Sequence, residues 1–217
     1  MNSEGRNPSA WHTFLLIGFL LFSSYLFSSL DVGSRPPAQG RPLLYCQFIA
    51  FEWMLFAFVF FGSDKALRNK IKSIFRNPSK ILIDTLIAAA IWALFAVAAP
   101  HIIRVLGYSG WGSTQALLPV GMLQVIMWIV LSMSAGFCEE VVFRGYLQEQ
   151  FARWTRLPVV GLLAQAILFG ISHGYQGPKN MTLIAVLGCI FGVVVLWRKQ
   201  LRPSVIAHTC IDIAGAF

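Results

Sequence analysis

The sequence predicts an all-α protein, a polytopic transmembrane helical bundle of about seven helices of which the last is short. Composition is the first observation behind this prediction, because 57% of the 217 residues are hydrophobic and only 12% are charged, about half the charged fraction of a soluble domain. The mean hydropathy is +0.67. The second observation is that apolar stretches recur along the whole chain, and no stretch between them suits a separate folded domain. We therefore expect a single integral membrane domain over residues 1–217.

Seven apolar stretches give the expected helices in order, and most approach the ~20 residues that span a hydrocarbon core. They cover residues 14–30, 43–61, 81–100, 117–137, 158–173, 181–197 and 204–217. The first is rich in Phe and lacks an Ala-x-Ala ending, which favours a retained helix over a cleaved signal peptide. The last would be ~21 Å long at 1.5 Å per residue, less than the ~30 Å core. It is therefore expected to span incompletely.

The fourth helix is expected to continue beyond its apolar stretch. Leu147, Phe151 and Trp154 recur at helical spacing while the polar residues between them face elsewhere. The sequence Thr155-Arg156-Leu157-Pro158 follows, and proline suits the first turn of a new helix. We therefore predict one long helix that breaks at this tetrapeptide, followed by an antiparallel neighbour.

Basic residues give the predicted orientation. Six lie between the second and third stretches, namely Lys65, Arg68, Lys70, Lys72, Arg76 and Lys80, and the positive-inside rule makes that loop cytoplasmic. Alternation then places the N-terminus and 13 of the 17 basic residues on the cytoplasmic side, and residues 107–114 in an outer loop. Topology and anionic lipid thus explain the net charge of +8 without nucleic acid. We expect localisation in a bacterial inner (plasma) membrane.

The four cysteines are expected to be reduced packing residues. Cys46, Cys138, Cys189 and Cys210 form no CxxC pair and lie in or beside apolar stretches, where cysteine behaves as a small hydrophobe.

A charged cluster in the fourth helix is the strongest indication of function. Glu139, Glu140 and Arg144 lie in an apolar environment, and each charge at the centre of a membrane helix costs roughly 2.5–3.5 kcal/mol. Glu140 and Arg144 have the i,i+4 spacing of an ion pair, which leaves Glu139 freer to act as a base. The cluster alone also fits an interfacial salt bridge. We test the hypothesis that it belongs to an intramembrane active site.

Helical spacing relates this cluster to polar residues elsewhere. Glu139 precedes the predicted break by about as many residues as His173 follows it, so an antiparallel hairpin brings the two side chains level. His208 and Asp212 are four residues apart and share one helix face. We expect all four in one cavity toward the cytoplasmic side. Residues 174–180 would then begin at membrane depth, which requires that they line a cavity.

Two further acids have open interpretations. Glu52 lies in the middle of the second helix, where it would line a substrate path, pair with Arg144 or be a satisfied buried acid. Asp84 lies near the start of the third helix, beside the basic loop, and is expected to form an ion pair at the cytoplasmic end.

Three motifs in this order resemble the CAAX protease and bacteriocin-processing (CPBP, Abi) family, which includes the CAAX prenyl endopeptidases. They are EExxxR at 139–144, FxxxH at 169–173 and HxxxD at 208–212. Each motif is loose alone, whereas the ordered set on successive hydrophobic helices is specific. The resemblance covers a motif-bearing core of roughly residues 80–217, and the first two helices are not diagnostic.

The resemblance implies an intramembrane glutamic endopeptidase that hydrolyses a peptide bond without a cofactor. Glu139 would be the general base that activates a water, and His173 would position that water. His208 and Asp212 would stabilise the oxyanion, and Glu140 with Arg144 would support the site. The implied partners are the lipid bilayer and a membrane-associated peptide or protein, with or without a lipid anchor, cut near the cytoplasmic face.

Two alternatives stay open. The prenyl endopeptidases have Asn where this chain has Asp212, and the set Glu139, His173, His208 and Asp212 is also compatible with zinc ligation in a metalloprotease. No HExxH motif supports zinc. The other alternative is a non-catalytic immunity protein that binds a peptide without cleaving it. A proton-coupled transporter is disfavoured because the sequence has no inverted repeat.

Overall fold

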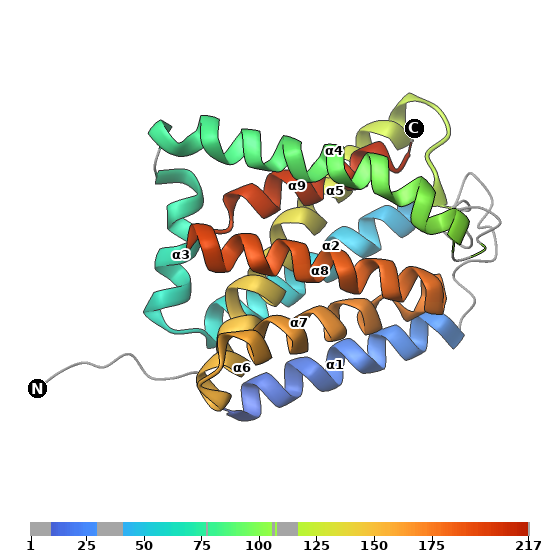
Figure 1. Ribbon diagram of the computed structural model, residues 1–217. Helices are drawn as coiled ribbons and strands as arrows, with labels where there is room; N and C mark the ends of the chain where they lie inside the picture. The colour runs from blue at the N-terminus through green and yellow to red at the C-terminus, as the bar shows by residue number, and fades with distance from the viewer. Residues whose placement is uncertain (1–9, 30–40, 77, 106, 108–116, 217) are drawn as a thin grey trace, which may run out of the picture.

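The computed structural model describes residues 10–29, 41–76, 78–105, 107 and 117–216, and this part of the chain consists of helices joined by turns, without a strand (Figure 1). Five helices are long and apolar enough to cross a membrane. They are Ala10–Ser29, Arg41–Gly62, Pro78–Ile102, Met122–Thr155 and Pro178–Arg198. The predicted polytopic helical bundle is confirmed, and the chain is an integral membrane protein.

Each of the seven predicted apolar stretches forms a helix. These are α1 (Ala10–Ser29), α2 (Arg41–Gly62), α4 (Ile81–Val105), α5 (Met122–Glu139), α7 (Pro158–Ser172), α8 (Pro178–Arg198) and α9 (Arg202–Ala214). The remaining elements are α3 (Lys65–Arg76), η2 (Pro78–Lys80), η4 (Glu140–Leu147), α6 (Gln148–Thr155) and η5 (Gly174–Gln176). The last helix has 13 residues, as short as predicted. The expected outer loop at 107–114 lies outside the described residues except for Gly107.

Helix α3 is an element that the sequence analysis treated as a loop. Leu67, Ile71 and Ile74 are buried and recur at helical spacing, whereas the basic residues between them point outward. The many charged residues of this segment made its narrow apolar stripe hard to recognise in the sequence. Helix α3 lies across one end of the bundle, roughly perpendicular to the long helices (Figure 1).

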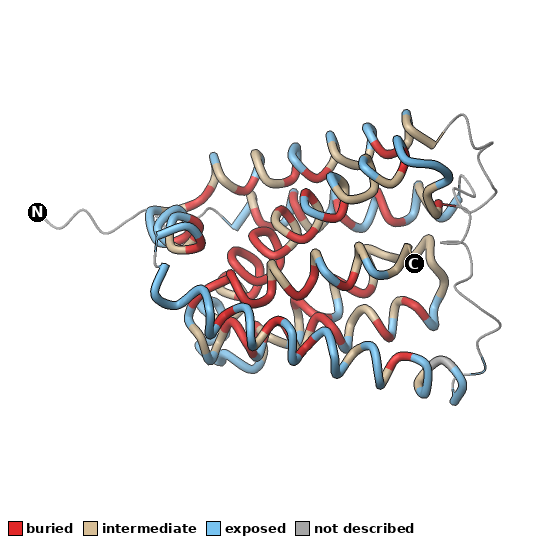
Figure 2. The backbone as a smooth tube through the Cα atoms, turned by 90° about the horizontal axis from the view of Figure 1, so that it is seen from above, coloured by how far each residue is buried: buried red, intermediate tan, exposed pale blue. Residues whose placement is uncertain are grey.

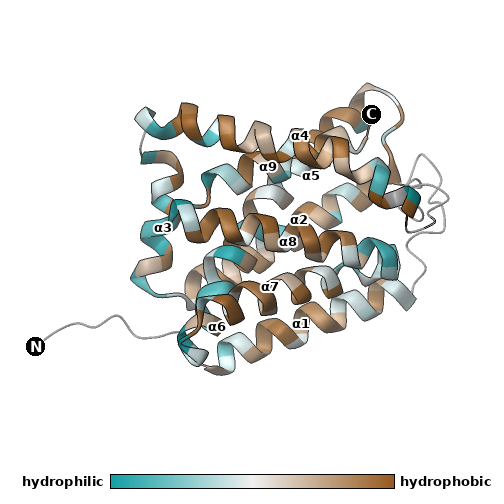
Figure 3. Cartoon of the chain, in the orientation of Figure 1, coloured by the Kyte–Doolittle hydropathy of each residue, from teal (hydrophilic) through white to brown (hydrophobic). Residues whose placement is uncertain are grey.

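We call the end that carries α3 the basic end. It also includes the start of α4, the turn between α6 and α7 and the turn between α8 and α9, and its polar surface stands out in Figure 3. Its basic residues are Lys65, Arg68, Lys70, Lys72, Arg76, Lys80, Arg153, Arg156, Arg198, Lys199 and Arg202. The far end carries only Arg41, Arg104 and Lys179 among the described residues.

Asp84 connects several elements at the basic end. Its carboxylate is fully buried and lies 2.8 Å from Nη2 of Arg198 and 3.1 Å from Nη1 of Arg202. The side-chain amide of Gln200 donates to both of its oxygens. The predicted ion pair is confirmed, and its partners come from the end of α8 and the start of α9 rather than from α3.

A continuous helical run from Met122 to Thr155 passes through the middle of the bundle. Its central part, η4, is a π-helix in which all eight residues are buried, and burial is concentrated around it (Figure 2). The predicted continuation and the break before Pro158 are confirmed. The π-helix was not predicted, and such wide turns often occur at functional sites.

Close helix contacts place the functional residues. Helix α9 packs against both α5 and α4, and α2 packs along α5. A Cβ atom added at Gly136 of α5 would lie 2.3 Å from Oγ1 and 2.9 Å from the backbone nitrogen of Thr209 in α9. Glycine is therefore required where α5 and α9 cross, one turn from Glu139.

Replacing Gly136 with Ala is expected to force α5 and α9 apart and to lower the thermal unfolding temperature in detergent. Overpacking of this kind typically costs about 1–3 kcal/mol. Gly18→Ala in α1 is the matched control, because no atom lies within 4 Å of the added Cβ, and it is expected to leave stability unchanged or slightly higher. Equal unfolding temperatures for the two variants would contradict the close approach of α5 and α9.

Candidate active site

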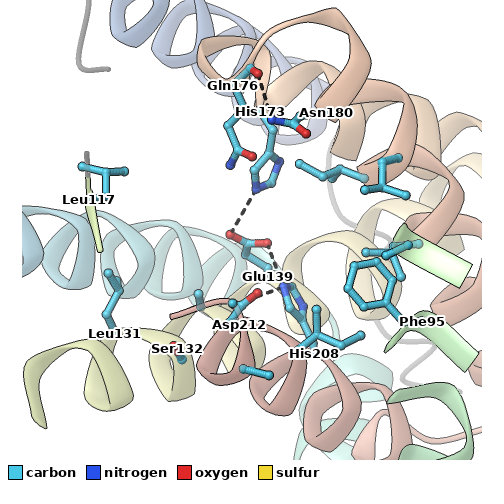
Figure 4. A pocket seen from close by; sticks show the side chains of 18 of the residues that line it. Phe95, Leu117, Leu131, Ser132, Glu139, His173, Gln176, Asn180, His208 and Asp212 are labelled. Carbon is cyan, nitrogen blue, oxygen red and sulfur yellow. Dashed lines mark hydrogen bonds and ion pairs between the residues drawn. The ribbon is translucent and has the colours of Figure 1, made fainter. Parts of the chain in front are cut away.

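A cavity of about 430 Å³ lies between α2, α4, α5, α8 and α9, within the usual size range of small-molecule and peptide sites. Most of its wall is aliphatic or aromatic, including Trp92, Phe95, Trp128 and Phe191. Its ionisable side chains are Glu52, Glu139, His173, His208 and Asp212. Figure 4 shows Glu139 at the centre, with His173 on one side and His208 and Asp212 on the other.

Glu139 ends α5 and reaches both histidines. Its Oε1 lies 4.0 Å from Nε2 of His173, and its Oε2 lies 3.7 Å from Nε2 of His208. Both separations are longer than a direct hydrogen bond, and gaps of this size are suited to a bridging water. The register predicted for the hairpin therefore agrees with the observed proximity of Glu139 and His173.

The orientation of His173 follows from its position at the C-terminus of α7. Its Nδ1 donates to the carbonyl of Phe169 at 2.8 Å. Because a carbonyl oxygen can only accept, this contact places a proton on Nδ1 and turns Nε2 toward Glu139. Ser24 of α1 secures the same turn, since its hydroxyl donates to the carbonyl of Ile171 and accepts from the backbone N–H of Gly174.

The segment after His173 lines the cavity, as the sequence required of a non-helical stretch at membrane depth. Tyr175, Gln176 and Asn180 belong to its wall. Gly177 makes the turn into α8 with φ at +86°, a conformation that glycine adopts without strain.

Glu140, Arg144 and His208 form a buried polar chain behind Glu139. Nη1 of Arg144 donates to Oε1 of Glu140 at 2.7 Å, and both side chains are completely buried. The same oxygen lies 3.0 Å from Nδ1 of His208. The guanidinium also lies 4.0 Å from the ring centroid of Phe169, a cation–π contact that partly replaces its lost hydration. The predicted ion pair is thus observed, with an added contact to His208.

Asp212 is closer to the cavity mouth than the other acids. Its side chain is 32% exposed, and its Oδ2 lies 3.5 Å from Nε2 of His208. The other ring nitrogen of His208, Nδ1, is bound by Glu140. Asp212 therefore faces the nitrogen that is directed into the cavity.

Glu52 is a further acid of this cavity. It is 9% exposed, it lines the cavity together with Glu139, and the two carboxyl groups interact. Of the interpretations left open by the sequence, pairing with Arg144 is not observed: among the described residues the ion-pair partner of the guanidinium is Glu140. The mid-helix position of Glu52 was the only sequence signal for its place in the cavity.

Residues 121–214 match the family model described as type II CAAX prenyl endopeptidase Rce1-like. That segment is therefore similar to the CAAX proteases. The Rce1-like segment includes all three motifs and begins just before α5, so it is shorter than the core of residues 80–217 expected from the resemblance. Searches of curated proteins and of solved structures gave no match. At family level, the Rce1-like segment is that of a membrane-embedded protease acting on a peptide substrate.

The cavity lies away from the basic end. Every helix that lines it contributes residues from its far half, such as Pro100 of α4, Trp128 of α5 and Asn180 of α8. The expectation that the cavity is on the same side as the basic loops is therefore wrong. The reason is that α7 stops at Ser172, so His173 lies a full helix length from the turn at Pro158.

The donor set was tested for compatibility with zinc. Tetrahedral ligands at 2.0–2.1 Å from zinc lie roughly 3.4 Å apart, whereas the donor atoms around Glu139 are separated by 3.7 and 4.0 Å. Within the described ranges, no three His, Cys, Asp or Glu side chains form a group that could hold a metal ion. The chelator experiment described below tests the zinc alternative.

Proposed function

We propose that the protein is an intramembrane endopeptidase in which Glu139 activates a water molecule for attack on a peptide bond. The observation that carries this proposal is the position of the Glu139 carboxylate between Nε2 of His173 and Nε2 of His208, in a cavity with largely apolar walls. A base, a water and a preorganised donor are sufficient for amide hydrolysis.

The two acceptors on one side of the cavity suit a nucleophilic water. Because Nδ1 of His173 carries the proton that it donates to the Phe169 carbonyl, the other ring nitrogen, Nε2, is an acceptor. Oε1 of Glu139 is an acceptor as well. A water between these atoms, which are 4.0 Å apart, donates one hydrogen to each. Its lone pairs then point away from both residues and toward the substrate carbonyl carbon. Glu139 takes one of the two protons as the new C–O bond forms.

His208 is the proposed oxyanion donor. Its Nδ1–H is held by Glu140, and its Nε2 faces the carboxylates of Glu139 and Asp212. A proton on Nε2 is therefore directed at the reacting atoms, where it can be donated to the developing oxyanion. Collapse of the tetrahedral intermediate breaks the C–N bond, and Glu139 returns its proton to the leaving amine.

Asp212→Asn is expected to retain cleavage, because Asn is the residue of the prenyl endopeptidases and its amide is a neutral donor beside His208. Asp212→Ala is expected to lower kcat by about 10-fold or more, since it removes a polar group from the cavity. The measurement is the rate of cleavage of a membrane-anchored peptide by both variants. If Asp212→Asn abolishes activity and added zinc restores it, the zinc alternative is favoured instead.

The experiment that tests the proposed function compares wild-type and Glu139→Gln protein in that assay, each with and without a chelator. Loss of cleavage in the variant alone supports the general base. Loss of wild-type cleavage on chelation, restored by zinc, supports the metalloprotease. Binding of peptides by wild type without cleavage of any member of a broad panel supports the non-catalytic immunity protein.

A further inference from the structure

We infer that the active-site cavity opens to the non-cytoplasmic side of the membrane and acts on peptide segments presented there. This inference rests on the proposed function and adds to it the side of access and the class of substrate. It follows from two independent features of the fold, the position of the cavity along the helices and the distribution of basic residues between the two ends.

The cavity runs from the middle of the bundle to the end opposite α3. Its inner limit is formed by Glu139, His208 and Phe191. From there its wall follows the far halves of α4, α5 and α9, as far as Pro100 and Ala214, which are exposed. None of its described lining residues belongs to α3, α6 or the turn between α8 and α9.

A hydrophobic barrier separates the same site from the basic end. Val141, Val142 and Leu147 of η4, Leu67 of α3 and Leu201 are all at most 2% exposed and belong to one core cluster. The buried ion pairs of Asp84 close this end on the α4 side. The polar side chains between the site and this end, Arg144 and Gln148, are at most 2% exposed, and the described cavity lining does not extend from Glu139 toward the basic end.

Helix length gives the depth of the site. Helix α7 starts at the basic end and has 15 residues, so it extends about 22 Å before reaching His173. The run from Glu139 to Thr155 gives about 24 Å along the central helix. Both distances exceed half of a ~30 Å hydrocarbon core. Measured from the helix ends at the basic end, the catalytic residues thus lie in the half of the bundle nearer to the end at which the cavity opens.

The charge distribution assigns the basic end to the cytoplasm. Among the described residues, eleven Lys and Arg lie at the basic end, and three lie at the far end. Short loops with such an excess of Lys and Arg are retained on the cytoplasmic side. Helix α3 adds to this assignment, because its outward basic face suits the anionic headgroups of the cytoplasmic leaflet. The open end therefore faces away from the cytoplasm.

The cavity wall indicates the chemistry of the substrate. Its ionisable groups are three carboxylates and two histidines, and no Lys or Arg is among the residues described as lining it. A C-terminal carboxylate bound inside would have no Lys or Arg partner, and burying an unpaired charge is costly. The substrate segment that fits is an internal, apolar or neutral stretch of a membrane-anchored polypeptide exposed on the non-cytoplasmic side.

Cysteine labelling tests the orientation without depending on activity. In a background with the four native cysteines replaced, Val120→Cys reports the cavity end and Ser79→Cys reports the basic end. Both positions are exposed and uncharged, so the charge balance is unchanged. In bacterial spheroplasts, a membrane-impermeant maleimide is expected to label Val120→Cys and not Ser79→Cys, and inside-out vesicles are expected to give the reverse. Labelling of Ser79→Cys in spheroplasts would overturn the assigned orientation.

A paired cleavage assay tests the side of access. Two reporters carry the same neutral, apolar segment next to a single membrane anchor. The first reporter presents this segment on the cytoplasmic side, and the second presents it on the non-cytoplasmic side. We expect cleavage of the second reporter only, and its loss in Glu139→Gln. Cleavage of the cytoplasmic reporter alone would overturn the inference while leaving the proposed function intact. Cleavage of the outer reporter that survives Glu139→Gln would overturn the proposed function but not the orientation given by labelling.

Discussion

Glu139→Gln is expected to reduce peptide-bond cleavage by about 10²–10⁴-fold, the usual contribution of a general base. Gln has nearly the same shape as Glu and can still contact His173 and His208, but it cannot take a proton from water. KM is expected to change little, because the lost interaction acts on the water rather than on the bound peptide. The measurement is kcat and KM in proteoliposomes with a membrane-anchored reporter, together with the thermal unfolding temperature.

A matched control separates catalysis from charge. Glu149→Gln makes the same chemical change at the basic end, where Glu149 pairs with Lys70 and is 34% exposed. It lies outside the cavity lining and is expected to leave kcat unchanged. Activity of Glu139→Gln equal to that of Glu149→Gln would show that the carboxylate of Glu139 is not the base.

Arg144→Met is expected to be the most destabilising single substitution in the site. Arg144 and Glu140 are both completely buried, and removing one partner of such a pair leaves a buried charge at a cost of about 3–5 kcal/mol. The contact of the guanidinium with the Phe169 ring is lost as well. The expected result is a lower unfolding temperature in detergent and a lower yield of folded protein.

The double variant Glu140→Gln with Arg144→Met distinguishes charge from packing. It removes the unpaired carboxylate, so much of the stability is expected to return. Cleavage is expected to stay low, because Nδ1 of His208 loses its charged partner. Arg153→Met is the control at the surface, where ion pairs contribute about 0–1 kcal/mol. If the double variant is no more stable than Arg144→Met, the buried charge is not the source of the instability.

Much of the fold was predictable because its determinants are local. Apolar stretches of membrane length gave each of the seven apolar helices, and Pro158 gave the break between α6 and α7. The ion pair of Glu140 with Arg144 follows from i,i+4 spacing within one continuous helix. The proximity of Glu139 to His173 follows almost as directly, because a short turn couples the register of two adjacent antiparallel helices.

Contacts between helices distant in sequence were less predictable. The contact of Nδ1 of His208 with Glu140 of η4 was not predicted, because the two residues are 68 positions apart. Glu52 of α2 shares the cavity with Glu139 although no motif includes it. Both outcomes depend on how α9 and α2 pack against α5, including the close contact at Gly136.

The sequence by itself determined that this chain is a helical membrane protein with a buried Glu, His and Asp set, since hydrophobicity and helical spacing act over short distances. Only the tertiary structure decided which carboxylate orients which histidine and at which end the cavity lies. The physical reason is that these properties depend on helix packing, which brings side chains together from helices far apart in the chain. The charged cluster at Glu139, Glu140 and Arg144 is thus a local pattern whose chemistry depends on non-local neighbours.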